Sequence, residues 1–120
     1  MKVLIIDDDA DIRFVAAMSL RAGGAIDVVE ASGGLDGVCK AREEQPDVIL
    51  LDMMMPTMDG SQTIAALRMQ TETATTPVIF LTAKTIVAEV QGMKDLGAAG
   101  VLIKPFDPRT LAADLLALLT

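Results

Sequence analysis

This 120-residue chain contains no histidine, no tryptophan and no tyrosine, and it has only one cysteine, Cys39. Without histidine there is no imidazole metal ligand, no Ser–His or Cys–His nucleophile pair and no phosphohistidine on the chain itself. A single cysteine excludes an internal disulfide and fits a reducing compartment, so we expect a cytoplasmic protein. No apolar stretch approaches the roughly 20 residues that cross a bilayer, and the start shows no signal-peptide cleavage pattern.

Positive charge is also scarce, since 10 Lys and Arg face 17 Asp and Glu and give a formal net charge of −7. A field of that sign repels nucleic acid and anionic lipid, so we expect no direct nucleic-acid partner and no membrane partner. Apolar residues make up 52 % of the chain, and its length suffices for one hydrophobic core. The sequence therefore predicts a single domain over residues 1–120.

Five apolar, β-branched segments alternate with stretches of helical periodicity. Because these segments lack polar alternation, they are typical of parallel strands that are covered on both faces. The expected strands are residues 3–6, 25–29, 48–51, 78–81 and 101–103. The expected second helix, residues 32–45, contains glycines that lower its helix propensity. Five βα units predict an α/β fold with a doubly wound, five-stranded parallel sheet.

The helical stretches each show one apolar face. In the expected first helix this face consists of Ile12, Val15, Ala16, Ser19 and Leu20. The last helix repeats the spacing with Leu111, Leu115, Leu118 and Leu119. We expect these faces to pack against the sheet.

Polar side chains follow four of the five expected strands. They are Asp7, Asp8 and Asp9 after the first strand, Asp52 after the third, Thr82 after the fourth and Lys104 after the fifth. Ligands of such sheets bind at the carboxyl ends of the strands, so we expect these groups to converge at one edge. The first loop is anionic and lacks the glycines that hold phosphate. Clustered carboxylates suit Mg²⁺ or Mn²⁺, and a lysine with a hydroxyl suits a phosphoryl group.

Asp52 is the candidate nucleophile, because a carboxylate can form an aspartyl phosphate and Asp52 alone comes from the central strand. Some of these residues also have a purely structural interpretation. Asp9 and Asp11 are expected to favour the start of the first helix, one as its cap and the other in its first turn. Taken singly, Thr82 and Lys104 are ordinary strand-end residues, and it is the joint pattern that favours a functional site.

Four segments resemble motifs of the receiver domains of two-component response regulators, in the order that the family has. They are "IIDDDADIR", "VILLDMMMPTMDG", "VIFLTAK" and "VLIKPF". The resemblance implies a flavodoxin-like (βα)₅ fold with strand order 2-1-3-4-5, in which Asp52 is the phosphoacceptor. It implies Mg²⁺ or Mn²⁺ ligands at Asp7, Asp8, Asp52 and the main-chain carbonyl of Met54. It further implies phosphoryl-binding and switch roles for Thr82, Ala83 and Lys104, and a cis peptide bond before Pro105.

The same resemblance implies what the chain does. The phosphoryl donor would be a sensor histidine kinase or a histidine phosphotransfer protein. The chain would be a signalling domain rather than an enzyme, although it would assist its own phosphorylation and autodephosphorylation. Phosphorylation would switch the surface of the fourth helix, fifth strand and fifth helix toward an unidentified output partner or effector domain. We expect a monomer or a weak phosphorylation-dependent dimer, and a stand-alone regulator is favoured over a domain of a longer chain.

Val101 departs from the family pattern, which has an aromatic residue at this position of the fifth strand. Because valine is stiff and has little reach, aromatic gating is absent. We therefore expect the switch to rely on the backbone of the loop after the fourth strand and on the fourth helix.

Two alternatives remain open from the sequence. A haloacid-dehalogenase-type aspartyl phosphatase would use Asp7 as its nucleophile, but it needs a later acidic metal motif and leaves Asp52 without a role. A pseudo-receiver would be an interaction module that is never phosphorylated. The intact set of Asp52, Thr82 and Lys104 with the acidic pair argues against it.

Overall fold

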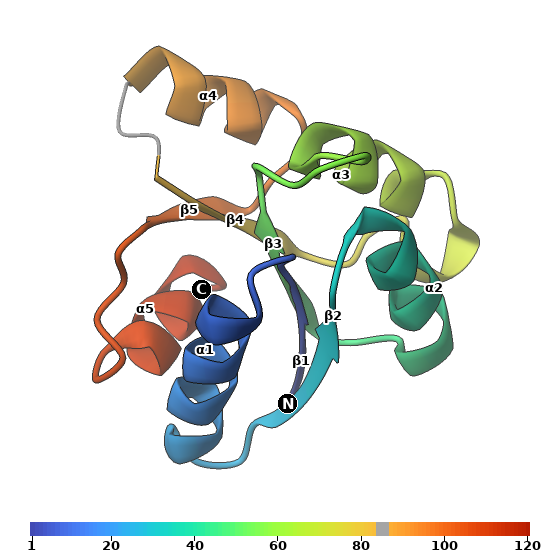
Figure 1. Cartoon of the computed structure of the whole chain (residues 1–120). Helices are drawn as coiled ribbons and strands as arrows, with labels where there is room; N and C mark the ends of the chain where they lie inside the picture. Colours follow the sequence, from blue (N-terminus) through green and yellow to red (C-terminus); the bar gives the residue numbers. More distant parts are fainter. Residues whose placement is uncertain (84–86) are drawn as a thin grey trace.

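The computed structural model of the chain describes residues 1–83 and 87–120, in which strands and helices alternate as predicted (Figure 1). The strands are β1 (Lys2–Ile6), β2 (Asp27–Ala31), β3 (Val48–Asp52), β4 (Val78–Thr82) and β5 (Gly100–Ile103). The helices are α1 (Ala10–Ala22), α2 (Gly34–Glu44), α3 (Gly60–Arg68), α4 (Val87–Asp95) and α5 (Leu111–Leu118), with a 3₁₀ turn, η1, at Thr71–Thr73. Among the described residues, no helix has the length and apolarity that a membrane span requires.

The sheet has the order β2-β1-β3-β4-β5, and its strands pair in parallel. This confirms the predicted α/β fold with a doubly wound five-stranded sheet. Helices α1 and α5 cover one face of the sheet, and α2, α3 and α4 cover the other (Figure 1). In the register, Ile6 lies opposite Leu51, and Asp52 lies opposite Leu81. The carboxyl ends of β1, β3 and β4 therefore lie side by side at one edge.

The sheet separates two apolar layers, and neighbouring residues of one strand belong to different layers. Leu4 and Ile6 of β1 pack in the layer beneath α2, α3 and α4. Val3 and Ile5 of the same strand pack in the layer beneath α1 and α5. Strands β3 and β4 are buried at every position, which is why their sequences are continuous apolar runs.

The second strand begins and ends two residues later than predicted, at Asp27–Ala31 in place of residues 25–29. The acidic residues Asp27 and Glu30 make the bounds of β2 hard to recognise in the sequence, because carboxylates are rare in strands. As an edge strand, β2 leaves Asp27 exposed. The carboxylate of Glu30 lies 3.4 Å from Nε of Arg13 in α1, so its charge is compensated.

The second helix forms in spite of its glycines and is shorter than predicted. A Cβ atom at Gly37 would collide with the side chain of Ile6 in β1. The missing side chain therefore lets α2 lie directly on the sheet, and this packing compensates for the low helix propensity.

The start of α1 agrees with the prediction, whereas its buried face differs in part. The carboxylate of Asp9 caps the helix and accepts hydrogen bonds from the amides of Asp11 at 2.9 Å and Ile12 at 3.2 Å. Val15 was expected on the buried face but is 39 % exposed, while Ala17 is buried. The buried face of α1 is thus centred on Ala16, Ala17 and Leu20, and Val15 lies beside it at the molecular surface.

Gly60, the first residue of α3, provides a test of how tightly the connection after β3 is packed. A Cβ atom there would lie 2.7 Å from Cα of Met53, 2.8 Å from Cε1 of Phe80 and 2.9 Å from the carbonyl oxygen of Asp52. We expect Gly60→Ala to lower the free energy of unfolding by about 1–3 kcal/mol, because backbone atoms cannot move aside. Urea unfolding followed by circular dichroism measures it.

The matched control is Gly92→Ala in α4, where a Cβ atom would meet nothing within 4 Å. Alanine has the higher helix propensity, so this change is expected to raise stability by up to about 1 kcal/mol. Equal effects of the two substitutions would contradict the packing argument.

Candidate functional site

Three carboxylates meet at the carboxyl edge of the sheet. Asp7 and Asp8 directly follow β1, and Asp52 is the last residue of β3. One carboxylate oxygen of each lies within 4.8 Å of the others. Asp7 and Asp52 are only 1 % and 5 % exposed, whereas Asp8 is exposed. The structure thus brings together the three acids that the sequence placed at strand ends.

Lys104 supplies the cation of the cluster from the end of β5. Its Nζ donates a hydrogen bond of 3.2 Å to Oδ2 of Asp7 and another of 3.2 Å to Oδ1 of Asp52. The amide of Lys104 donates to the carbonyl of Thr82 at 2.7 Å, which fixes the end of β5 beside the end of β4. The peptide bond between Lys104 and Pro105 is cis.

The surroundings of Asp52 and Lys104 change the affinity of both groups for protons. Burial, followed by repulsion from Asp7, raises the pKa of Asp52 to about 6 from an ordinary value of 3.8. Attraction and hydrogen bonding from Lys104 act in the opposite direction and limit this rise. Burial alone would lower the pKa of Lys104, but the charges of Asp7 and Asp52 outweigh it, so the pKa lies above its ordinary value. The lysine is therefore firmly protonated at neutral pH.

Asp7 is held at each of its polar groups. Its amide donates to the carbonyl of Ala31 at 3.2 Å, and its Oδ1 accepts from the amide of Asp9 at 2.9 Å. Nη1 of Arg13 donates to its carbonyl oxygen at 2.7 Å. Arg13 carries no recognisable signal in the sequence, because its side chain reaches back six residues to a position that no helical spacing rule indicates.

The remaining predicted site residues lie around this cluster. Thr82 ends β4 and is buried, and the exposed Ala83 follows it. The amide of Met54 donates to Oδ1 of Asp52 at 3.3 Å, while its side chain is 65 % exposed. Val101 in β5 is half-buried and packs against the layer beneath α4. The loop expected to carry the switch contains residues 84–86, which lie outside the described residues.

The donor set of Asp7, Asp8 and Asp52 fits a hard divalent cation. Mg²⁺ prefers carboxylate, carbonyl and water oxygens, and it usually takes only one or two carboxylates from a protein. Carboxylates that lie close together in a buried site repel one another, so a cation bound between them is electrostatically favourable. In the described structure, Lys104 meets part of that need.

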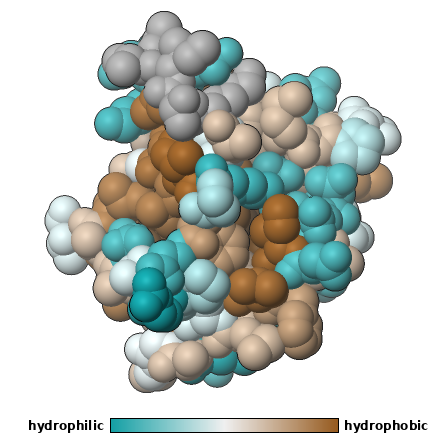
Figure 2. Space-filling model, turned by 60° about the vertical axis from the view of Figure 1, so that its left-hand side comes forward, coloured by the Kyte–Doolittle hydropathy of each residue, from teal (hydrophilic) through white to brown (hydrophobic). Residues whose placement is uncertain are grey.

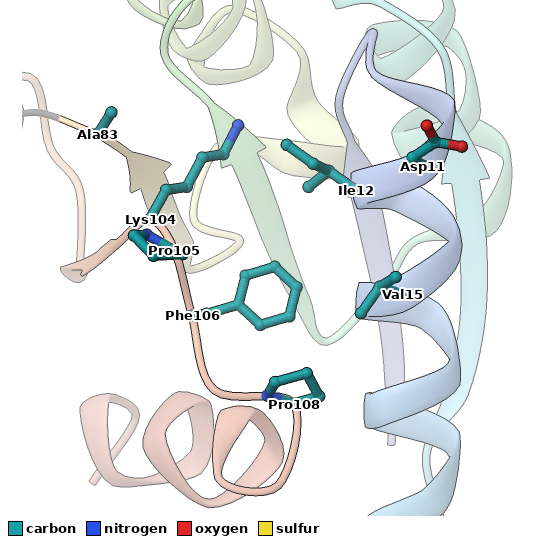
Figure 3. Close-up of a pocket in the computed structure, with 8 residues that line it drawn as sticks. All are labelled: Asp11, Ile12, Val15, Ala83, Lys104, Pro105, Phe106 and Pro108. Carbon is teal, nitrogen blue, oxygen red and sulfur yellow. The ribbon is translucent and has the colours of Figure 1, made fainter.

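A pocket of about 390 Å³ opens beside this cluster, between α1 and the connection from β5 to α5 (Figure 3). Ile12 and Val15 project from α1 toward Phe106, whose ring faces them across the pocket (Figure 3). The lining consists of Asp11, Ile12, Val15, Ala83, Lys104, Pro105, Phe106 and Pro108. A mostly apolar surface thus adjoins the charged cluster.

A family model described as "Response regulator receiver domain" matches residues 3–116 of the chain. The chain belongs to the family of response regulator receiver domains. This confirms the resemblance on which the sequence interpretation rested. The family match gives no support to the haloacid-dehalogenase alternative.

The receiver domain is similar to regulators of different lengths. It is 41 % identical to the "DNA-binding dual master transcriptional regulator RpaA" of Synechocystis sp. over 98 % of the chain and 48 % of that protein. It is 36 % identical to "Protein PilH" of Pseudomonas aeruginosa over 98 % of the chain and 97 % of that protein. The chain thus spans about half the length of several curated relatives that it matches.

Among solved structures, the receiver domain matches chemotaxis protein CheY4 of Vibrio cholerae with a TM-score of 0.90 and 38 % sequence identity. The match covers 98 % of this chain and 97 % of that chain. The flavodoxin-like fold with strand order 2-1-3-4-5 is therefore confirmed both by the sheet itself and by its likeness to a solved relative.

The raised pKa of Asp52 predicts a stability that depends on pH in the absence of metal. The folded state binds this proton more tightly than the unfolded chain does, so ionising Asp52 costs stability as the pH rises from about 4 through about 6. With a chelator present at about pH 7.5, Asp52→Asn should raise the free energy of unfolding by on the order of 2 kcal/mol. Below about pH 4 the difference should vanish, because Asp52 is then protonated in both states.

Urea unfolding at a series of pH values measures this difference. The control is Asp27→Asn, since Asp27 is an exposed carboxylate on the edge strand and its removal should change stability by less than about 0.5 kcal/mol. A stability gain of Asp52→Asn that is the same at all pH values would contradict the assignment to the ionisation of Asp52.

Proposed function

We propose that this receiver domain accepts a phosphoryl group on Asp52 from a phosphohistidine of a sensor histidine kinase or a histidine phosphotransfer protein. The observation that carries the proposal is the cluster of three carboxylates with Lys104 at 3.2 Å from both Asp7 and Asp52. It combines a nucleophile, a set of cation ligands and an ammonium group for phosphoryl oxygens. Phosphoryl transfer needs mainly such positioning and charge neutralisation.

Asp52 acts as the nucleophile in this proposal. Its Oδ1 accepts hydrogen bonds from Lys104 and from the amide of Met54, so Oδ2 is the oxygen left to attack phosphorus. Attack forms the O–P bond of an aspartyl phosphate while the N–P bond of the phosphoimidazole breaks. The departing imidazole nitrogen keeps the electron pair of that bond and takes up a proton from solvent. Lys104 stays protonated and pairs with the phosphoryl oxygens.

The proposed cation ligands are Asp7, Asp8, Asp52 and the main-chain carbonyl of Met54, for Mg²⁺ or Mn²⁺. Bound there, the ion would neutralise charge on the carboxylates and on the phosphoryl oxygens. The exposed side of the cluster is formed by Asp8, which leaves it accessible to a cation from solvent. The protein thereby assists its own phosphorylation and its autodephosphorylation.

Thr82 and Ala83 have the proposed switch and access roles at the end of β4. The new phosphoryl oxygens would attract the Thr82 hydroxyl and Lys104, which favours the active member of two pre-existing conformations. The output surface is that of α4, β5 and α5. In support, Leu96, Ile103 and Leu116 are large apolar residues that are 38–42 % exposed on or next to these elements. An output protein or effector domain, and any weak dimer of the phosphorylated form, would bind there.

The phosphodonor protein must cover the surface next to Asp52 in order to deliver its phosphohistidine. The apolar pocket beside Lys104 lies there, and α1 extends the apolar surface with Phe14 and Met18, which are 63 % and 54 % exposed. The side of the molecule that carries the β5–α5 connection, turned forward in Figure 2, shows brown hydrophobic patches among teal hydrophilic groups. We assign the docking of the donor to α1 and this connection.

Labelling with a small phosphodonor tests the proposed reaction. With Mg²⁺ and acetyl phosphate, we expect intact-protein mass spectrometry to show one added phosphoryl group, located on Asp52 by peptide mapping. Asp52→Asn should abolish it, and chelation of Mg²⁺ should do the same. Phosphoryl turnover that is lost in Asp7→Asn but kept in Asp52→Asn would instead indicate the phosphatase alternative. A chain that is never labelled would be a pseudo-receiver.

A second experiment separates donor docking from chemistry. The double variant Phe14→Ser/Met18→Ser should accept phosphoryl groups from acetyl phosphate at the wild-type rate. Its rate with the histidine kinase that phosphorylates the wild type fastest should fall about tenfold or more, because interface anchors of this kind contribute strongly to binding. The control is Leu35→Ser, whose apolar side chain is 73 % exposed on α2, on the other face of the sheet. Unchanged transfer from the kinase to the double variant would refute the docking assignment.

A further inference from the structure

We infer that Arg13 is a positioning residue that sets the geometry of the acidic pair Asp7–Asp8 for cation binding. The inference rests on the proposed function, since it takes these two residues as cation ligands. Arg13 itself contacts neither the carboxylate of Asp8 nor that of Asp52 in the described structure. It acts through the backbone of Asp7, and it is therefore a support of the site rather than a member of it.

Arg13 connects α1 with two other parts of the chain, the connection after β1 and the strand β2. The side chain leaves α1, and Nη1 donates to the carbonyl oxygen of Asp7, in the connection after β1, at 2.7 Å. Its Nε lies 3.4 Å from Oε1 of Glu30 in the edge strand β2. The Arg13 side chain is only 19 % exposed, so both contacts are partly shielded from water. A planar guanidinium held at two of its nitrogens has little freedom to turn.

The contact with the Asp7 carbonyl fixes the peptide unit that links the two acids. This carbonyl and the amide of Asp8 belong to one rigid plane, so holding the oxygen sets the direction in which the backbone enters Asp8. The carboxylate of Asp8 has no hydrogen bond of its own among the described residues, and the side chain is exposed. Its place in the cluster therefore depends on the backbone that carries it.

The other polar groups of Asp7 are anchored independently of Arg13. The amide is held by Ala31, and the two carboxylate oxygens are held by the amide of Asp9 and by Lys104. Among the described residues, Arg13 is the donor to the remaining group, the carbonyl. Loss of Arg13 would thus leave the Asp7 carboxylate in place and release the peptide plane that orients Asp8.

The sign of the effect distinguishes positioning from charge. The guanidinium of Arg13 is positively charged. By charge alone, its removal would therefore strengthen the binding of Mg²⁺ nearby. Glu30 compensates much of that charge at 3.4 Å, and Arg21 also lies 4.0 Å from Glu30. A positioning role predicts the opposite result, namely weaker cation binding when the guanidinium is lost.

The experiment is an Mg²⁺ titration of ¹⁵N-labelled, unphosphorylated protein by NMR. The amide resonances of Asp9 and Met54 report binding, and the temperature is chosen so that the spectrum is that of a folded domain. We expect Arg13→Met to raise the Kd for Mg²⁺ about tenfold, as is typical when the support of a metal ligand is lost. Arg13→Lys keeps the positive charge but lacks the planar guanidinium with its several N–H donors, so it should give an intermediate Kd. The control Arg21→Met removes an arginine that shares Glu30 but does not touch Asp7, and its Kd should stay within about twofold of wild type.

Each other result counts against the inference in a defined way. An Arg13→Met protein that binds Mg²⁺ as tightly as wild type, or more tightly, overturns it. If Arg13→Met does not fold, Arg13→Lys decides, because it keeps the positive charge and should still raise the Kd, and an unchanged Kd overturns the inference. A wild-type protein without Mg²⁺-dependent shifts would instead refute the proposed cation site, and the inference would fall with it.

Discussion

Two buried carboxylates that share one ammonium group are the constraint on which the rest of this edge depends. Asp7 and Asp52 lie almost out of contact with water, where like charges repel strongly. Lys104 offsets that repulsion only because β5 ends at the same level as β4, so that the lysine extends across β4 to both acids. The strand order therefore does more than pack the core, since it brings Lys104 of the last strand connection to Asp7 and Asp52 in the first half of the chain.

Much of the fold and the charged edge could be predicted from the sequence. The segment "VILLD" is apolar without alternation because both faces of β3 are covered, and such runs identify central strands. In a parallel sheet the carboxyl ends of the strands lie at one edge. The proximity of Asp7, Asp8, Asp52 and Lys104 can therefore be inferred from the sequence once the sheet is predicted. Roles such as metal ligation by the Met54 carbonyl stay predictions, because a backbone oxygen leaves no mark in a sequence.

The features that escaped prediction depend on long side chains and on small differences in helix rotation. The predicted second strand stopped before Glu30, whose charge is compensated by Arg13 of a different element. The spacing of Val15 placed it on the buried face of α1, yet Ala17 is buried instead and Val15 lines the pocket. Both cases are tertiary effects, in which contacts between elements outweigh the local pattern.

The sharing of the central strands between two apolar layers has a thermodynamic consequence. Leu4 and Ile5 are neighbours in β1, yet one belongs to the layer beneath α2, α3 and α4 and the other to the layer beneath α1 and α5. The same strands contribute side chains to both layers, so one layer cannot unfold while the strands stay packed in the other. The sheet thus makes unfolding cooperative across the whole thickness of the molecule, so that a loss of packing on one side is felt as a loss of stability on the other.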